Sequence, residues 1–74
     1  MTRLALVGLH GIIGEEWVRV SGTLEGDEPR VGGEVTLAVD GADITIATVR
    51  AVEDWGVPHL RTIAVDAAVA DLLR

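Results

Sequence analysis

Apolar residues recur at every second position through most of this chain, and this spacing constrains its fold more than any other feature. In residues 17–24, Val18, Val20 and Leu24 share one parity, while Trp17 and the polar side chains share the other. Successive side chains of a strand point to opposite faces, so a period of two is typical of a strand with one buried face. We therefore predict a half-buried strand here.

A second strand is expected over residues 34–40, where the same alternation returns. Val35, Leu37 and Val39 are expected to face inward, and polar residues such as Thr36 are expected to face outward. The alternation again indicates a sheet with one face on a core and the other toward water.

A tight hairpin should follow this strand. Asp40 and Gly41 form a dipeptide that tolerates the positive φ values of a two-residue type I′ turn. Ile44 and Ile46 resume the apolar alternation beyond the turn. The sequence therefore predicts two antiparallel strands joined at Asp40 and Gly41.

The apolar phase slips after Ile46, because Val49 rather than Thr48 is the next large apolar residue. One extra residue in a strand moves every later side chain to the opposite face. We therefore predict a β-bulge near Ala47 or Thr48, together with a bend of the strand.

Strands are also expected near both ends of the chain, with a short helix after the last one. The apolar runs from Leu4 to Leu9 and from Leu60 to Val65 are typical of strands. Asp66 is a favourable N-cap, and the alanine-rich segment behind it favours a helix. The apolar residues at helical spacing are Val65, Val69, Leu72 and Leu73.

These elements predict one mainly β domain over residues 1–74: a small six-stranded β-barrel with a short C-terminal helix. A chain of 74 residues buries only about 60% of the surface that its unfolded form exposes. It has no cysteine, so no disulfide can compensate for the small core. We therefore expect association with a partner or with itself to add stability.

The middle of the chain carries a family pattern. The run V-x-G-x-L-E from Val20 to Glu25 is followed by V-G-x-E-V-x-L from Val31 to Leu37, and Ile44 to Val49 looks like a further strand. Together these runs resemble the second-domain β-barrel of translational GTPases such as elongation factor Tu. The resemblance covers Val18 to about Val52 and implies a translation-factor-like barrel that docks on proteins or RNA. The chain has no lysine and no phosphate-binding loop, so it does not contain the GTPase itself.

Charge disfavours nucleic acid as the main ligand. Twelve acidic residues face six arginines, for a net charge of −6. Binding to a phosphate backbone depends on clustered lysine and arginine. RNA or translation-factor docking is therefore the third choice among the functions we consider.

A glycine pattern near the start offers an alternative function. Gly8, Gly11 and Gly14 follow an apolar run and resemble the phosphate-binding turn of extended short-chain dehydrogenases. Such a turn must open a helix whose N-terminus faces the phosphate. Because the alternation of Val18 and Val20 favours a strand instead, nucleotide or small-molecule binding through these glycines stays an alternative hypothesis.

Catalytic and metal-binding patterns are missing from the sequence. Its two histidines, His10 and His59, lie far apart, and there is no cysteine, tyrosine or lysine. Ser21 is the only serine and falls within a predicted strand. We therefore expect no enzyme activity, no cofactor and no resident metal.

The leading hypothesis is a non-enzymatic protein-interaction or assembly module that forms a homo-oligomer or docks on another protein. Exposed tryptophan and arginine are enriched at binding hot spots. The predicted partner-binding residues are Trp17, Arg19, Trp55, Leu72 and Leu73. No apolar run approaches the length of about 20 residues that crosses a membrane, so we expect a cytoplasmic protein without membrane contact.

Overall fold

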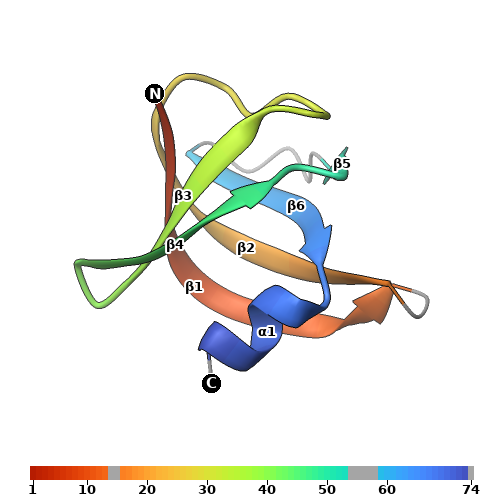
Figure 1. The fold of residues 1–74 in the computed structure, drawn as a ribbon. Helices are drawn as coiled ribbons and strands as arrows, with labels where there is room; N and C mark the ends of the chain where they lie inside the picture. Colours follow the sequence, from red (N-terminus) through yellow and green to blue (C-terminus); the bar gives the residue numbers. More distant parts are fainter. Residues whose placement is uncertain (14–15, 54–58, 74) are drawn as a thin grey trace.

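The computed structural model describes residues 1–13, 16–53 and 59–73, except the side chains of residues 9–13. It shows a mainly β domain with a short C-terminal helix, which confirms that part of the prediction (Figure 1). The elements in chain order are β1 (Thr2–Ile13), β2 (Trp17–Gly26), β3 (Glu34–Val39), β4 (Ala42–Thr48), β5 (Ala51–Glu53), β6 (Leu60–Asp66) and α1 (Ala68–Leu73).

The strands form one mixed sheet in the order β4-β3-β1-β2-β6-β5. β1 and β3 are parallel, and the other neighbouring strands are antiparallel. β4 and β5 stand at the two ends of this order and do not pair, so the prediction of a closed barrel is wrong. The reason lies in the chain itself, because β4 and β5 are consecutive parts of one segment. They follow each other end to end and therefore do not lie side by side.

Two residues carry the chain from one end of the sheet to the other. Val49 still belongs to the β3 side, because its N–H donates to the carbonyl of Gly33 and its carbonyl accepts from Gly32. The N–H of Arg50 donates to the carbonyl of Ala64 in β6. The sheet is therefore curled so strongly that its two end strands, β4 and β5, meet at this bend.

The β3–β4 hairpin has the predicted turn, but its bulge lies elsewhere. Asp40 has a φ of 51° and Gly41 a φ of 83°, as a type I′ turn requires. The β3–β4 register skips Ile44, which lies between two paired residues of β4. The prediction of a bulge near Ala47 or Thr48 is therefore wrong.

The early bulge decides which side chains of β4 face the core. Ala47 and Val49 are buried, whereas Ile44 and Ile46 are 42% and 63% exposed. Since Ile44 is itself the extra residue, the phase of the alternation changes before Ile46 rather than after it. Two large aliphatic side chains are thereby placed on the outside.

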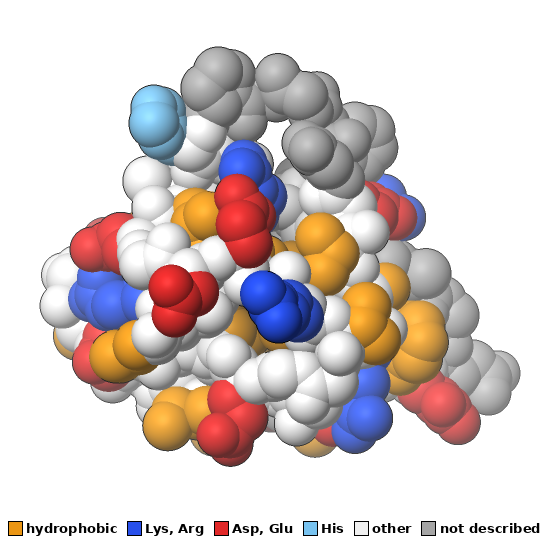
Figure 2. Space-filling model, turned by 90° about the horizontal axis from the view of Figure 1, so that it is seen from above, with side chains coloured by type: hydrophobic (Ala, Val, Ile, Leu, Met, Phe, Trp, Pro, Cys, Tyr) orange, Lys and Arg blue, Asp and Glu red, His pale blue; other side chains and the backbone are white. Residues whose placement is uncertain are grey.

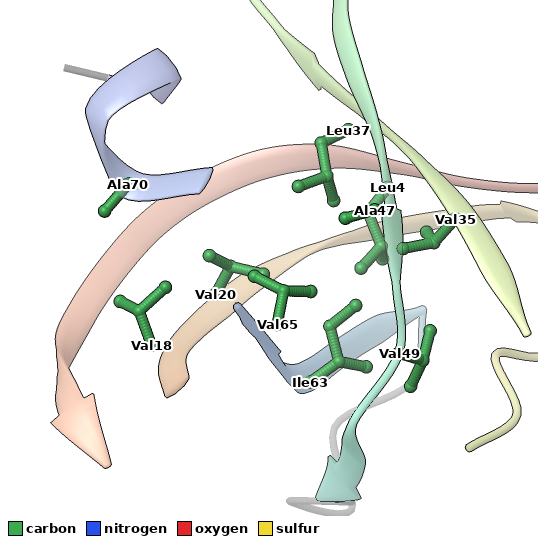
Figure 3. Packing of buried hydrophobic residues seen from close by; sticks show 10 residues of the cluster. All are labelled: Leu4, Val18, Val20, Val35, Leu37, Ala47, Val49, Ile63, Val65 and Ala70. Atoms are coloured by element: carbon green, nitrogen blue, oxygen red, sulfur yellow. The ribbon is translucent and has the colours of Figure 1, made fainter. Parts of the chain in front are cut away.

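The curled sheet encloses a core of aliphatic side chains (Figure 3). Its largest fully buried members are Leu4, Val20, Val35, Leu37, Val49, Ile63 and Val65. Val18, Val35 and Leu37 face this core as predicted, while Val39 is half-buried. Burying each such side chain contributes roughly 1.5–3 kcal/mol.

Helix α1 packs against both β4 and β6 and closes the space between them. Ala70 joins the core, and Val69 and Leu73 pack against it. The helix begins after Ala67, so the prediction of Asp66 as its N-cap is wrong. Asp66 is still the last residue of β6, and its carboxylate accepts hydrogen bonds from Arg50.

The connection from β2 to β3 passes around the start of β1, because β2 and β3 pair with opposite edges of that strand. Gly26, with a φ of 86°, lies at this crossing, where a Cβ atom would stand 2.1 Å from the carbonyl oxygen of Met1. The next residue, Asp27, donates its N–H to the same carbonyl at 2.9 Å. The connection does reverse the chain, but β1 lies between the two strands that it joins.

A substitution at Gly22 tests the close approach of β1 and β2. A Cβ atom at this position would lie 2.7 Å from the carbonyl oxygen of Ala5, inside contact distance. We expect Gly22→Ala to lower the free energy of unfolding by about 1–3 kcal/mol, since the backbones must separate. Urea denaturation measures this change, with Thr23→Ala on the exposed neighbour as the control. An unchanged value for Gly22→Ala would contradict the strand pairing.

Candidate interaction surface

The predicted docking residues Trp17 and Arg19 lie on the outer face of β2, opposite the core-facing Val18. Trp17 is half-buried. The Nε atom of Arg19 lies 3.1 Å from Oε2 of Glu53, and both atoms are buried without a hydrogen bond of suitable geometry. Arg19 is therefore held in an ion pair within the domain.

The other predicted docking residues lie at the C-terminal helix or outside the described part of the chain. Leu72 is 58% exposed on α1. Leu73 packs against the core instead of facing outward. Trp55 lies outside the described residues. The N–H of Ala67 donates to the carbonyl of Glu16, which brings the start of α1 beside the residue that precedes Trp17.

The glycines of the alternative hypothesis do not lead into a helix. Gly8 and Gly11 lie inside β1, and Gly14 lies outside the described residues. The next element in the chain is β2. A nucleotide-binding turn needs the N-terminus of a helix at this point.

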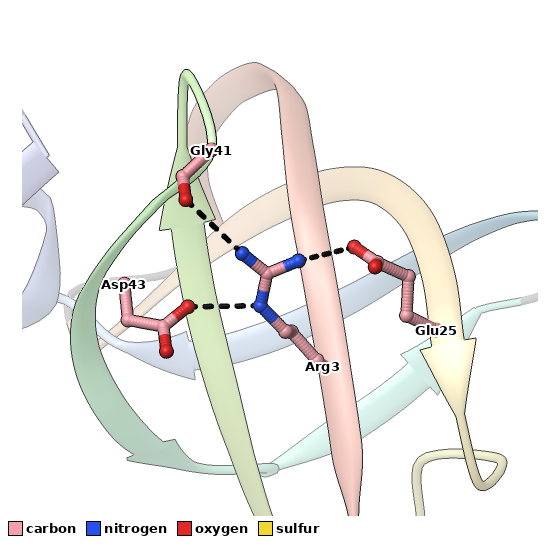
Figure 4. Close-up of polar contacts among 4 residues, drawn as sticks. All are labelled: Arg3, Glu25, Gly41 and Asp43. Carbon is pink, nitrogen blue, oxygen red and sulfur yellow. Dashed lines mark hydrogen bonds and ion pairs between the residues drawn. The ribbon is translucent and has the colours of Figure 1, made fainter.

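Arg3 crosses the outer face of the sheet and joins three strands (Figure 4). Its Nε atom donates to Asp43 of β4 at 2.8 Å, and its Nη1 atom donates to Glu25 of β2. Its Nη2 atom lies 3.4 Å from the carbonyl oxygen of Gly41 in the hairpin turn. Because β3 lies between β1 and β4, the side chain of Arg3 reaches across β3.

Thr36 and Ala38 on the outer face of β3 are buried, although Thr36 was expected to be exposed, whereas Glu34 at the start of the strand is exposed as predicted. Thr36 is 8% exposed and lies between Arg3 and Ile46 in the strand register. Ala38 is fully buried and lies between Ala5 of β1 and Asp43 of β4. Both residues lie on the strand that the Arg3 side chain crosses on its way to Asp43.

Most described arginines are held in ion pairs of this kind. Arg50 donates to Asp66 at 2.9 Å, and Arg61 donates to Glu28 at 2.6 Å. Such exposed pairs fix side-chain positions more than they add stability. They also remove these arginines from contact with a partner.

Two adjoining hollows lie at the end of the sheet that carries the N-terminus. The parallel pairing of β1 and β3 brings the starts of both strands to this end. The first hollow, of about 420 Å³, is lined by Thr2, Asp27, Glu28, Arg30, Gly33 and Glu34. The second, of about 400 Å³, is lined by Met1, Thr2, Glu34, Thr36 and Ile46. We call the two together the outer hollow, since they share Thr2 and Glu34.

Figure 2 looks onto this end of the molecule, where acidic, basic and hydrophobic side chains are interspersed. Met1 is 79% exposed and Ile46 63% exposed at the apolar part of the outer hollow. At its polar part, Asp27 pairs with the amino group of Met1 at 2.6 Å. This contact, chiefly its hydrogen bond, lowers the pKa of the Asp27 carboxyl.

Arg30 and Glu34 are the remaining charges of the outer hollow, and the charge of Arg30 contributes to the lowered pKa of the Asp27 carboxyl. Among the described residues, neither has an opposite charge within 4.0 Å. A tight turn separates them, in which the N–H of Gly33 donates to the carbonyl of Arg30 at 2.9 Å. Gly32 supplies the positive φ of 87° that this turn requires.

The described residues show neither a metal centre nor a membrane span. Within residues 1–13, 16–53 and 59–73, no three histidine or acidic side chains gather as metal ligands do. In the same part of the chain, no helix has the length and apolar character to span a bilayer. Comparison with protein-family models, curated proteins and solved structures finds no match for this chain.

The sequence did not point to the outer hollow. Its alternation grouped Ile46 with the apolar residues of the predicted strands, and Arg30 belonged to a stretch interpreted as a turn. One signal was available in the sequence. Ala47 and Val49 alternate with Ile46, so a strand that buries Ala47 and Val49 must place Ile46 on its outer face. The position of Met1 beside Glu34 depends on the parallel strand pair and has no local signal.

Arg3 variants test the contact that joins β1, β2 and β4. Arg3→Met keeps most of the aliphatic stem but removes the donors, whereas Arg3→Lys keeps the charge without the planar fork. We expect the urea midpoint to fall for Arg3→Lys and to fall further for Arg3→Met. Asp71→Asn, an exposed change on α1, is the control. Equal midpoints for Arg3→Met and wild type would show that the guanidinium contributes nothing.

The Arg50–Asp66 pair predicts a pH dependence of stability. The hydrogen bond from Arg50 lowers the pKa of Asp66 below its ordinary value of 3.8. The stabilisation is therefore fully present above pH 3.8 and is lost as the pH falls through the lower, folded-state pKa. We expect Asp66→Asn to be less stable than wild type near neutral pH, with the difference shrinking in acid. Thermal denaturation across this range measures it, and a constant difference would contradict the pairing.

Proposed function

We propose that this domain is a non-enzymatic protein-interaction module that self-associates or docks on a partner protein through the outer hollow. The observation that carries the proposal is the position of exposed Met1 and Ile46 beside Arg30 and Glu34 in the outer hollow, where neither charge has an opposite charge within 4.0 Å among the residues that the structure describes. A central apolar contact with polar groups at its rim is the usual composition of a protein interface.

The fold and the composition support an interaction role. The core is aliphatic and small, so stability gained from an added subunit would be substantial in relative terms. The residues of the outer hollow come from β1, β3, β4 and the connection before β3, and a partner bound there would contact all of them.

The resemblance to the second domain of translational GTPases fits the same proposal. In that family the barrel serves as a docking module beside another domain. We propose that the curled sheet, with its end strands joined at Val49 and Arg50, serves as a docking module in the same way. The acidic balance of the chain favours protein over RNA as the partner.

Sedimentation at increasing protein concentration tests self-association. We expect the mass to rise above that of a monomer between micromolar and millimolar concentrations. Ile46→Asp should weaken the association about tenfold or more, because it places a charge in an apolar contact. Leu72→Asp, an equally drastic change on exposed α1, is the matched control.

The pair of variants also decides between the two ends of the molecule. If Leu72→Asp abolishes association and Ile46→Asp leaves it intact, the contact lies at α1 and the outer hollow is not the interface. A wild-type monomer at every concentration would exclude self-association and leave docking on a different protein.

A further inference from the structure

We infer that the partner at the outer hollow is a second copy of this chain, related by a two-fold axis that sets Arg30 of each copy against Glu34 of the other. This inference rests on the proposed function and names its partner and its central polar contact. In a two-fold interface the same patch meets itself, so each feature must find its complement within that patch.

The charges of the outer hollow are self-complementary. Arg30 and Glu34 both line its 420 Å³ part, and neither has an opposite charge within 4.0 Å among the described residues. A two-fold axis between two such patches forms two identical ion pairs. One cation and one anion of each copy are thereby satisfied.

A partner with one dominant sign of charge fits this surface less well. Asp27 is paired with the amino group of Met1, and Glu28 is paired with Arg61. The hollow is therefore close to neutral locally, although the whole chain carries a net charge of −6. A basic segment would meet Arg30, and an acidic segment would meet Glu34. A second copy offers both signs.

The apolar part of the patch can also meet itself. Met1 and Ile46 are exposed beside Thr36, which forms part of the lining of the second hollow. Val31, the residue after Arg30, is 68% exposed in the tight turn. Contact of these side chains across the axis would remove apolar surface from water on both copies.

The dimensions of the molecule allow such a contact. A stable interface takes about 800 Å² from each partner, whereas the whole chain exposes 4469 Å². Such an interface takes roughly a fifth of that surface, so the contact extends beyond the outer hollow to neighbouring exposed residues such as Val31. Because a hydrogen-bonded turn separates Arg30 from Glu34, little backbone freedom would be lost on binding.

Charge reversal at positions 30 and 34 tests whether these two residues contact each other across the dimer interface. If they served only the fold of a single copy, mixing the two variants would not restore association. Arg30→Glu gives a copy with two acids at the contact, and Glu34→Arg gives a copy with two arginines. Each variant alone should dissociate about a hundredfold more readily than wild type, because like charges then face each other twice. An equimolar mixture should form a heterodimer, since both contacts become complementary again.

Sedimentation velocity on wild type, each variant, the mixture and the double variant measures these states. The double variant Arg30→Glu with Glu34→Arg keeps the composition and net charge of wild type, and it should form a homodimer. Asp71→Arg, with the same charge change as Glu34→Arg but located on α1, should dimerise like wild type. Circular dichroism establishes that each variant is folded.

Restored association in the mixture and in the double variant supports the inference. A dimer that both single variants leave intact overturns the inference, but self-association itself then stands. Single variants that remain monomeric when mixed also overturn it, because the contact between the two residues is then not direct. A wild-type monomer at millimolar concentration overturns both the inference and the self-association part of the proposed function.

Discussion

The parallel pairing of β1 with β3 is the constraint on which the rest of this structure depends. It consists of three residue pairs, Arg3 with Thr36, Leu4 with Leu37 and Ala5 with Ala38. Parallel neighbours need a long connection, and here β2 and the segment behind it provide one. On the inner face the pairing joins Leu4 and Leu37 in the core, and on the outer face Arg3 extends across β3 to the hairpin. Loss of this pairing would separate β3 and β4 from the rest of the sheet.

The same pairing creates the candidate surface. Strands that run in the same direction begin at the same end of a sheet, so Met1 and Thr2 come to lie near Glu34, more than thirty residues away in the chain. β4 returns antiparallel to β3 and brings Ile46 to that end as well. The connection before β3 passes around β1 and adds Arg30. The surface is therefore a consequence of topology, and no short motif in the sequence encodes it.

Local patterns predicted the local structure well. The alternation around Val18 and Val35 identified β2 and β3, the Asp40-Gly41 dipeptide identified the hairpin, and the alanine-rich end identified α1. Two of the predictions that failed, the position of the bulge and the closed barrel, concern the relation between strands. A bulge at Ile44 depends on how β4 pairs with β3, and the open order of the sheet depends on where the chain leaves β4. The open order has no signature in residue spacing, and the facing of β4 has only the phase of Ala47 and Val49 as a signal, because both features depend on partners distant in sequence.

The distribution of charge explains how an acidic chain can still present a balanced contact surface. Arg3, Arg19, Arg50 and Arg61 each lie against an acid within the domain, where they span strands or fix the ends of β6. At the outer hollow, Asp27 and Glu28 are paired in the same way, with the amino group of Met1 and with Arg61. Long-range repulsion between two copies is screened within about 8 Å at physiological salt. At contact distance, Arg30 and Glu34, which have no opposite charge within 4.0 Å in the described part of the chain, therefore have more influence on the choice of partner than the net charge has.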